Sequence, residues 1–137
     1  MQLTHLFQQA KQASRSVASM TDEARNAVLL AVAEEIRTQS ASLLQANRKD
    51  LAAMHKSNPL YDRLMLTDER LCVISHDMEN VTRLPSPLGR VSHERTLDNG
   101  LRLHRVSVPF GVIGVVYEAR PNVTFDVFAL CLKSGNA

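Results

Sequence analysis

Residues Pro109–Ala137 read PFGVIGVVYEARPNVTFDVFALCLKSGNA, and this stretch decides the fold. Residues 112–117 are a nearly continuous apolar run, which is typical of a strand covered on both faces in a parallel α/β sheet. After a polar turn, residues 123–132 are apolar almost all round, which predicts a buried helix that ends near Gly135. A strand and a helix make half of a βαβ unit, so we expect an α/β fold that is cut before its next strand.

A hairpin is predicted just before this stretch. Residues 90–97 and 101–108 flank Asp98-Asn99-Gly100, which tolerate the positive φ of a tight turn. The apolar residues change parity near Arg105, which indicates a bulge or a strand that leaves one packing environment for another. Because the first strand is largely polar, we expect a projecting arm that pairs through its edge with another chain or domain.

Helical patterns dominate the first 89 residues. A first helix is predicted to face the core with apolar residues at helical spacing, namely Leu3, Leu6, Phe7, Ala10 and Val17. Thr21 is a candidate N-cap of a second helix, whose predicted apolar face comprises Ala24, Val28, Ala31, Val32 and Ile36. Leu66 and Leu71 flank Thr67 as a hydrophobic staple at the start of a later helix, whose predicted stripe comprises Leu71, Ile74, Met78 and Val81.

The helical region has one polar exception and a clear end. Asn47 interrupts the apolar pattern of residues 43–54, and we interpret it as a wet or capped position. Pro85 and Pro87 remove backbone donors and fix φ, so the architecture must change there.

Composition narrows the class of protein. The 137 residues carry a formal net charge of +2 with scattered basic side chains, and there are only four Phe, two Tyr and no Trp. These features argue against a nucleic-acid interface, which needs a basic stripe or a stacking platform. No apolar run approaches membrane-spanning length, and the N-terminus lacks the features of a secretion signal, so we expect a cytoplasmic protein without a membrane partner.

The cysteines and histidines indicate neither a disulfide nor a metal. Cys72 and Cys131 lie in helical patterns, where we expect reduced, buried thiols that lack the low pKa of a nucleophile. The five histidines show no metal-ligand spacing with each other or with either cysteine, so no metal site is predicted.

Three stretches in order resemble the γ-glutamyl phosphate reductase family: LYDRLMLT at residues 60–67, LDNGLRLHRVSVPFG at residues 97–111, and YEARPNVT at residues 117–124. The resemblance covers essentially the whole chain, and the last stretch is its most specific part. It implies the aldehyde dehydrogenase superfamily, in which a Rossmann-like cofactor domain joins a catalytic domain with a nucleophilic cysteine and an oligomerisation arm.

This resemblance implies a truncated aldehyde dehydrogenase-like fold of the α/β class. Residues 1–89 would be the N-terminal helical part of the cofactor domain, residues 90–108 the hairpin oligomerisation arm, and residues 109–137 the first strand, turn and helix of the cofactor domain. The parent enzyme would reduce L-glutamyl 5-phosphate to L-glutamate 5-semialdehyde with NADPH and release phosphate, a step of proline biosynthesis. We expect this chain alone to be inactive, because it holds no plausible nucleophile.

The resemblance also assigns roles in the turn. By position, Asn122 matches the amide that donates to the oxyanion in the wider superfamily, although Pro-Asn before an apolar helix is also ordinary N-cap chemistry. Arg120 is a candidate clamp for the substrate's phosphate or carboxylate, or a solvated loop residue. Tyr117, Glu118, Ala119 and Arg120 would line the path of the cofactor at the carboxyl end of the strand.

Two other interpretations stay open. The chain would be a self-association or assembly module without catalytic chemistry, or part of a fused kinase–reductase. Whether the chain belongs to a separate reductase or to a fused kinase–reductase, we expect a small-molecule substrate and a homo-oligomer that forms through the arm.

Overall fold

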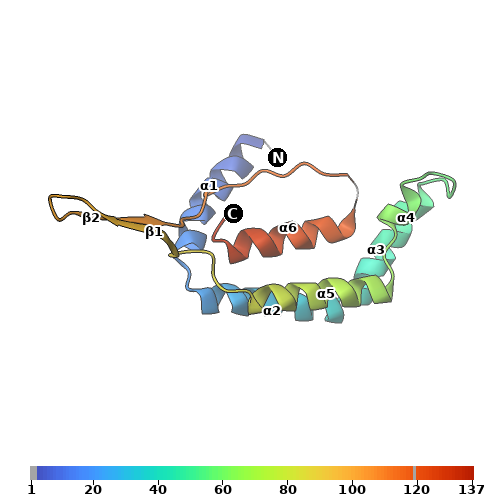
Figure 1. The fold of residues 1–137 in the computed structure, drawn as a ribbon. Coiled ribbons are helices and arrows are strands. Elements are labelled where there is room, and N and C mark those ends of the chain that lie inside the picture. Colours follow the sequence, from blue (N-terminus) through green and yellow to red (C-terminus); the bar gives the residue numbers. More distant parts are fainter. Residues whose placement is uncertain (1–2, 119) are drawn as a thin grey trace.

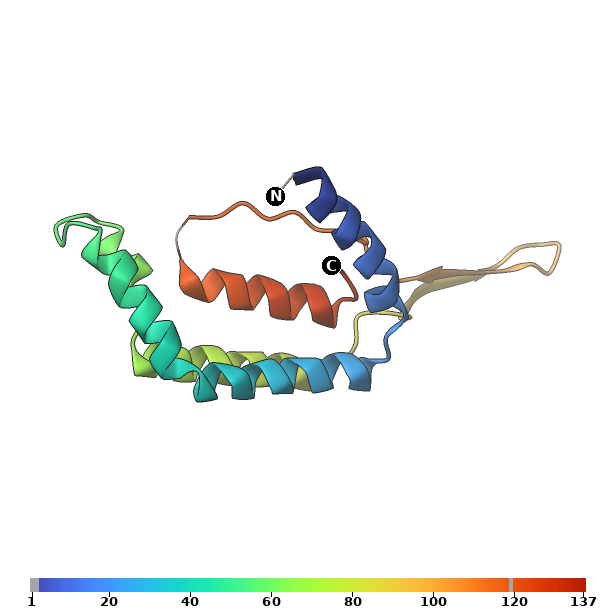
Figure 2. The same cartoon turned by 180° about the vertical axis from the view of Figure 1, so that it is seen from behind.

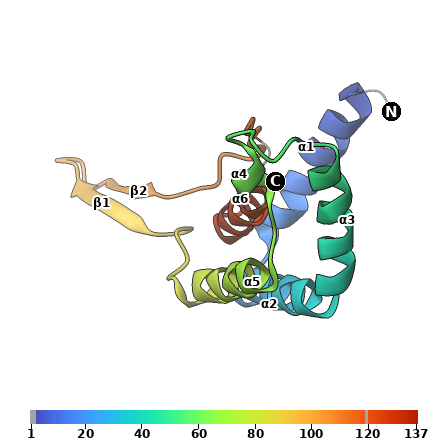
Figure 3. The same cartoon turned by 90° about the vertical axis from the view of Figure 1, so that its right-hand side faces the viewer.

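The computed structural model describes residues 3–118 and 120–137 (Figure 1). In chain order, its elements are α1 (Leu3–Ser19), α2 (Asp22–Thr38), α3 (Ser40–Ala52), α4 (Tyr61–Leu64), α5 (Asp68–Arg83), β1 (Val91–Thr96), β2 (Arg102–Val106) and α6 (Pro121–Lys133). Helices α2 and α5 lie side by side, and α6 packs on both of them (Figures 1 and 2). The hairpin of β1 and β2 projects away from these helices (Figure 3).

The core lies where α2, α5 and α6 meet. Its buried apolar residues are Leu29, Ala33, Ile36, Leu71, Ile74, Met78, Ala129 and Leu132. This confirms the stripe predicted for α5. The face predicted for α2 is partly wrong, because Val28 is exposed whereas Leu29 and Ala33 are buried. Helix α2 touches both α5 and α6, so two neighbours rather than its own apolar pattern decide which side is covered.

Local signals at the starts of α2 and α5 are confirmed. The side chain of Thr21 accepts a hydrogen bond from the Ala24 N–H at 3.2 Å, and Thr67 accepts one from the Arg70 N–H at 3.2 Å. Both residues therefore cap helices whose first turns carry acidic residues, which suit the helix dipole.

The prediction for α1 is wrong over its first half. Phe7 is 68% exposed, and Leu3 and Leu6 are exposed as well. Only the second half reaches the core, through the partly buried Val17 and the buried Ser14. Helix α1 rises steeply from the start of α2, and its first turns lie well away from the α2–α5 pair, so their apolar residues are not covered within the described chain (Figure 1).

The hairpin is confirmed as an exposed arm. Strands β1 and β2 pair antiparallel, every residue in them is exposed, and Gly100 provides the positive φ of the turn. The register shifts between Val91 and His93, so Ser92 is the extra residue of a bulge on β1. This bulge faces Arg105, near the position at which the parity of β2 changes.

The strand predicted at residues 112–117 is not formed as predicted. The segment is exposed and runs past α6 without a neighbouring strand in the described chain (Figure 1). One pairing is present: the Ala137 N–H donates to the Gly111 carbonyl and the Ile113 N–H donates to the Ala137 carbonyl, each at 2.8 Å. These two bonds bracket Val112 in the pattern of a parallel ladder. One such pairing is too short to make a strand.

Helix α6 is buried on one side only, so the prediction of a helix buried all round is wrong. Ala129 and Leu132 face the core, whereas Phe128 and Leu130 are exposed. At its end the chain turns at Gly135, which has a φ of +73° and lies so close to Leu88 that a Cβ would be 2.6 Å from the Leu88 Cδ1. The turn brings Asn136 against Gly111, whose N–H donates to the Asn136 Oδ1 at 2.9 Å.

Candidate functional site

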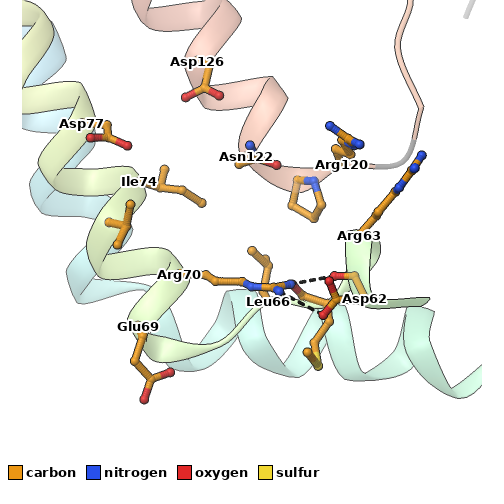
Figure 4. Close-up of a pocket in the computed structure, with 13 residues that line it drawn as sticks. Asp62, Arg63, Leu66, Glu69, Arg70, Ile74, Asp77, Arg120, Asn122 and Asp126 are labelled. Carbon is orange, nitrogen blue, oxygen red and sulfur yellow. Dashed lines mark hydrogen bonds and ion pairs between the residues drawn. The ribbon is translucent and has the colours of Figure 1, made fainter. Parts of the chain in front are cut away.

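A pocket of about 420 Å³ lies between the α4–α5 region and the N-terminus of α6 (Figure 4). One wall comes from the segment around α4, a second from α5, and a third from the first turns of α6. The lining residues are Asp62, Arg63, Met65, Leu66, Glu69, Arg70, Val73, Ile74, Asp77, Arg120, Pro121, Asn122 and Asp126. The floor is apolar and the rim carries both signs of charge.

The start of α6 places two of the predicted site residues in this pocket. Arg120 is the N-cap residue and Pro121 is the first helical residue, a position that suits proline because its missing N–H has no partner there. Asn122 is therefore inside the first turn, and the N-cap role considered for it is wrong. Its exposed side chain makes no hydrogen bond to the residues that the structure describes, so the amide is free to donate into the pocket.

The guanidinium of Arg120 is also free within residues 3–118 and 120–137. Its backbone is held, because the Arg120 N–H donates to the Glu118 carbonyl and its own carbonyl accepts from the Val123 N–H at 3.1 Å. A free guanidinium at a helix N-terminus suits an anionic group such as a phosphate or a carboxylate.

The other predicted turn residues do not line this pocket. The Glu118 carboxylate pairs with the guanidinium of Arg63, with 2.9 Å between Nη1 and Oε2, and this pair ties the turn to α4. Tyr117 borders another cavity on the opposite side of α6, and its hydroxyl lies 2.6 Å from the Thr124 Oγ1. Ala119, which was predicted to line the cofactor path, lies outside the described residues.

Two polar residues build the wall near α4: Arg70, which the sequence did not single out, and Asn47, which it did. Arg70 donates to the carbonyls of Asp62 and Met65 at 2.6 Å each and to the Asp62 carboxylate at 3.0 Å. Asn47 was interpreted as a wet or capped position; it is only 5% exposed, so the wet alternative is wrong. Its amide donates to the Leu64 carbonyl at 2.8 Å and accepts from the Leu66 N–H at 2.8 Å, which fixes the segment after α4. The sequence signal for this role was the lone amide in an apolar stripe, because a buried amide needs hydrogen-bond partners.

Neither cysteine lines the pocket. Cys72 is exposed, contrary to the prediction of a buried thiol, because its side of α5 faces away from the core. Cys131 is partly buried, and this burial raises the pKa of its thiol, which disfavours the thiolate. Within the described residues, no group of three or more His, Cys, Asp or Glu could hold a metal ion. No helix in that part of the chain is long and apolar enough to cross a membrane.

Comparisons with known proteins identify relatives that extend well beyond this chain. γ-Glutamyl phosphate reductase of Bacteroides thetaiotaomicron is 56% identical over 135 residues, which are 98% of this chain and 32% of that protein. The enzyme of the same name from Chlorobium luteolum is 58% identical over 127 residues, 93% of this chain and 30% of its own length. No family model matches the chain.

Solved structures give the same result. The crystal structure of γ-glutamyl phosphate reductase from Thermotoga maritima matches with a TM-score of 0.88 and 35% identity, over 95% of this chain and 32% of the other. The enzyme from Saccharomyces cerevisiae matches with a TM-score of 0.85 and 32% identity, over 93% and 33%. The predicted fold, that of the N-terminal part of such an enzyme, is thereby confirmed. The chain spans about a third of the length of these relatives.

Proposed function

The chain belongs to the family of γ-glutamyl phosphate reductases, and we propose that the whole protein reduces L-glutamyl 5-phosphate to L-glutamate 5-semialdehyde with NADPH and releases phosphate. The observation that carries this proposal is the start of α6, where Asn122 and Arg120 both line one pocket with an apolar floor. An uncharged donor and a guanidinium side by side suit an acyl phosphate, which has a carbonyl oxygen next to a phosphoryl group.

Asn122 would donate to the oxygen of the acyl group when attack on its carbon makes that oxygen negative. An amide donates at any pH, because it does not titrate in the physiological range. Arg120 would bind the phosphoryl group or the carboxylate of the substrate with two parallel hydrogen bonds. The ion pair of Arg63 with Glu118 would hold the turn in place while both residues act.

The residues of the turn also fit an anionic dinucleotide, which would supply the hydride when bound. Arg120 offers a free guanidinium beside a helix N-terminus, and Tyr117 offers a half-exposed ring. The negative charge of Glu118 is offset by Arg63, so it would not repel a phosphate strongly. These residues would bind and orient the cofactor.

The test joins this chain to the remaining two-thirds of the Bacteroides thetaiotaomicron enzyme and measures oxidation of glutamate 5-semialdehyde by NADP⁺ in phosphate. We expect activity in the hybrid, and a fall in kcat of about 10²–10³ for Asn122→Ala, the usual effect of losing an oxyanion donor. Asn80→Ala on α5, outside the pocket, is the matched control and should keep full activity.

An inactive hybrid that is folded would contradict the proposed reaction. Equal kcat values for Asn122→Ala and Asn80→Ala would remove the role given to Asn122. The 137-residue chain alone is expected to show no oxidation, since neither cysteine lines the pocket. Measurable turnover by it would overturn the need for a nucleophile from elsewhere in the protein.

The second candidate function is self-association without chemistry, and the fully exposed arm favours it. It is compatible with the first, because we propose that the whole enzyme is a homo-oligomer joined through this arm. We further propose a cytoplasmic location, which suits a biosynthetic reductase with free cysteines and which cell fractionation would test.

A further inference from the structure

Three carboxylates of the pocket take no part in the interactions described so far, namely Glu69, Asp77 and Asp126. Glu69 points away from α6 (Figure 4), so the other two are the ones that matter here. Asp77 projects from α5 and Asp126 from α6, on facing sides of the gap between the two helices (Figure 4). The other carboxylates near the turn are occupied, Asp62 by Arg70 and Glu118 by Arg63. Asp77 and Asp126, by contrast, form no hydrogen bond or ion pair with any residue that the structure describes.

The two aspartates lie at one place in the cavity. Both line the main pocket, and both also line a smaller one that continues between α5 and α6. Ile74 borders both cavities as well, so the carboxylates flank an apolar patch at the junction. The nearest free positive group on the same pocket is Arg120, which projects from the turn just before α6.

This arrangement fits one kind of small molecule. Going along α6 from its start, the pocket offers a guanidinium at Arg120, an amide at Asn122 and a carboxylate at Asp126, one turn later. The floor between them is apolar, with Leu66, Ile74 and Pro121. A ligand with an anionic group, an acyl carbon, a short methylene chain and a cationic group would satisfy all of these features in turn.

A metal ion is a poorer occupant than an organic cation. Among the described residues, no group of three or more His, Cys, Asp or Glu side chains could hold one. Two carboxylates beside an apolar patch instead suit an ammonium group on a carbon chain, whose hydrogens donate to both carboxylates while its methylenes contact Ile74.

Resting on the proposed function, we propose that Asp77 and Asp126 bind the α-ammonium group of the γ-glutamyl substrate and thereby select an amino acid over a simple dicarboxylic acid derivative. Arg120 and Asn122 then serve the other end of the same molecule. The two aspartates are specificity residues and take no part in bond making or breaking.

The experiment uses the 137-residue chain and two stable ligands that differ only in the α-ammonium group. L-Glutamate γ-methyl ester carries the group, and glutaric acid monomethyl ester lacks it. Binding is followed by NMR titration of the backbone amides of α5 and α6. We expect the amino acid ester to bind at least about fivefold more tightly, and to shift signals around Asp77 and Asp126, since charge-assisted hydrogen bonds are stronger than neutral ones.

Two variants locate the effect. Asp126→Asn and Asp77→Asn should each weaken binding of the amino acid ester about three- to tenfold and leave binding of the other ester unchanged or slightly tighter. Asp50→Asn, an exposed aspartate on α3 outside the pocket, is the matched control and should change neither.

The outcomes separate this inference from the function on which it rests. Equal binding of the two esters, or equal losses of affinity for both esters in the aspartate variants, would overturn the ammonium site. If the hybrid enzyme were active, the proposed reaction would still stand. Absence of binding by either ester would overturn the pocket as a glutamyl site altogether.

Discussion

At the scale of single residues, two buried cations, Lys133 and Arg25, share one carboxylate where three helices meet. Lys133 of α6 donates from Nζ to the Asp22 carboxylate at 2.9 Å and to the Asn26 Oδ1 at 2.8 Å on α2, and lies 3.4 Å from the Thr82 carbonyl on α5. Arg25, also buried, donates to the Met20 carbonyl at 2.7 Å and lies 3.6 Å from Asp22. One carboxylate therefore compensates two buried cations, which makes its ionisation important.

The pH dependence of stability should reveal Asp22. Its pKa is lowered, chiefly by the hydrogen bond from Lys133, so the ionised form is favoured in the folded state. The stabilisation is fully present above the unfolded carboxyl pKa of about 4 and is lost as the pH falls through the lower folded value. Urea unfolding from pH 7 to pH 2 should show a smaller decline of the free energy of unfolding for Asp22→Asn than for the parent. For Asp50→Asn, the free energy of unfolding should decline as it does in the parent. An equal decline for Asp22→Asn and Asp50→Asn would contradict the role given to Asp22.

Gly135 should resist substitution for two reasons. Its positive φ strains any L side chain, and a Cβ would be 2.6 Å from the Leu88 Cδ1. We expect Gly135→Ala to lower the free energy of unfolding by about 2–4 kcal/mol, the sum of a left-handed penalty and overpacking. Gly89 has the same φ of +73° but open space around it, so Gly89→Ala should lose only about 1–2 kcal/mol in the same urea titration. Equal losses would show that the contact with Leu88 relaxes freely.

At the scale of elements, the wall near α4 depends on one buried amide. Asn47 of α3 holds the Leu64 carbonyl and the Leu66 N–H, so the segment that joins α4 to α5 is fixed from outside itself. Arg70 then holds the same segment from α5. Side chains of α3 and α5 therefore hold this pocket wall in place.

Replacing this amide should loosen the wall. Asn47→Ala would leave a part-buried carbonyl and a part-buried N–H without partners, which should lower the free energy of unfolding by about 2–3 kcal/mol and speed amide exchange at Leu66. Asn58→Ala is the matched control, because the Asn58 Oδ1 accepts from the Leu60 N–H at an exposed site. It should cost less than about 1 kcal/mol. An Asn47 variant as stable as the control would contradict the clamp.

Elements set by local signals, such as caps and turns, were predictable from the sequence. Elements whose burial depends on packing partners remote in the chain were not. Thr21 and Thr67 act on helices that start at the next residue, and Gly100 shapes its own turn, so their patterns sufficed. The exposed half of α1 and the segment at residues 112–117 have convincing apolar patterns, but what covers an apolar face depends on partners remote in the chain. For the site, the resemblance located Arg120 and Asn122. Asp77 became visible only once α5 packed against α6.

At the scale of the whole molecule, the arm is the part most available to a second copy. Its two strands are exposed along their full length, and Leu103 of β2 is one of the exposed apolar residues of the arm. Edge strands of this kind pair readily with other chains.

Self-association should therefore depend on the arm. We expect sedimentation velocity to show concentration-dependent dimers of this chain, and Leu103→Asp to raise the dissociation constant at least about tenfold by placing a charge in the contact. Leu30→Asp introduces the same charge at an exposed leucine on α2 and should leave association unchanged. A chain that stays monomeric at all concentrations would remove the arm from the interface.

The contact of Asn136 and Ala137 with Gly111 and Ile113 also sets how freely the turn can move. It joins residues 25 apart and so closes a loop that contains the whole segment with Asn122. Closing a flexible loop of that size costs about 3 kcal/mol of chain entropy, beyond a constant, and that freedom is already lost in the folded state. A substitution at Asn136 that breaks this contact would therefore widen the range of positions open to the loop. The position of Asn122 would become less fixed, although no atom of the site is changed.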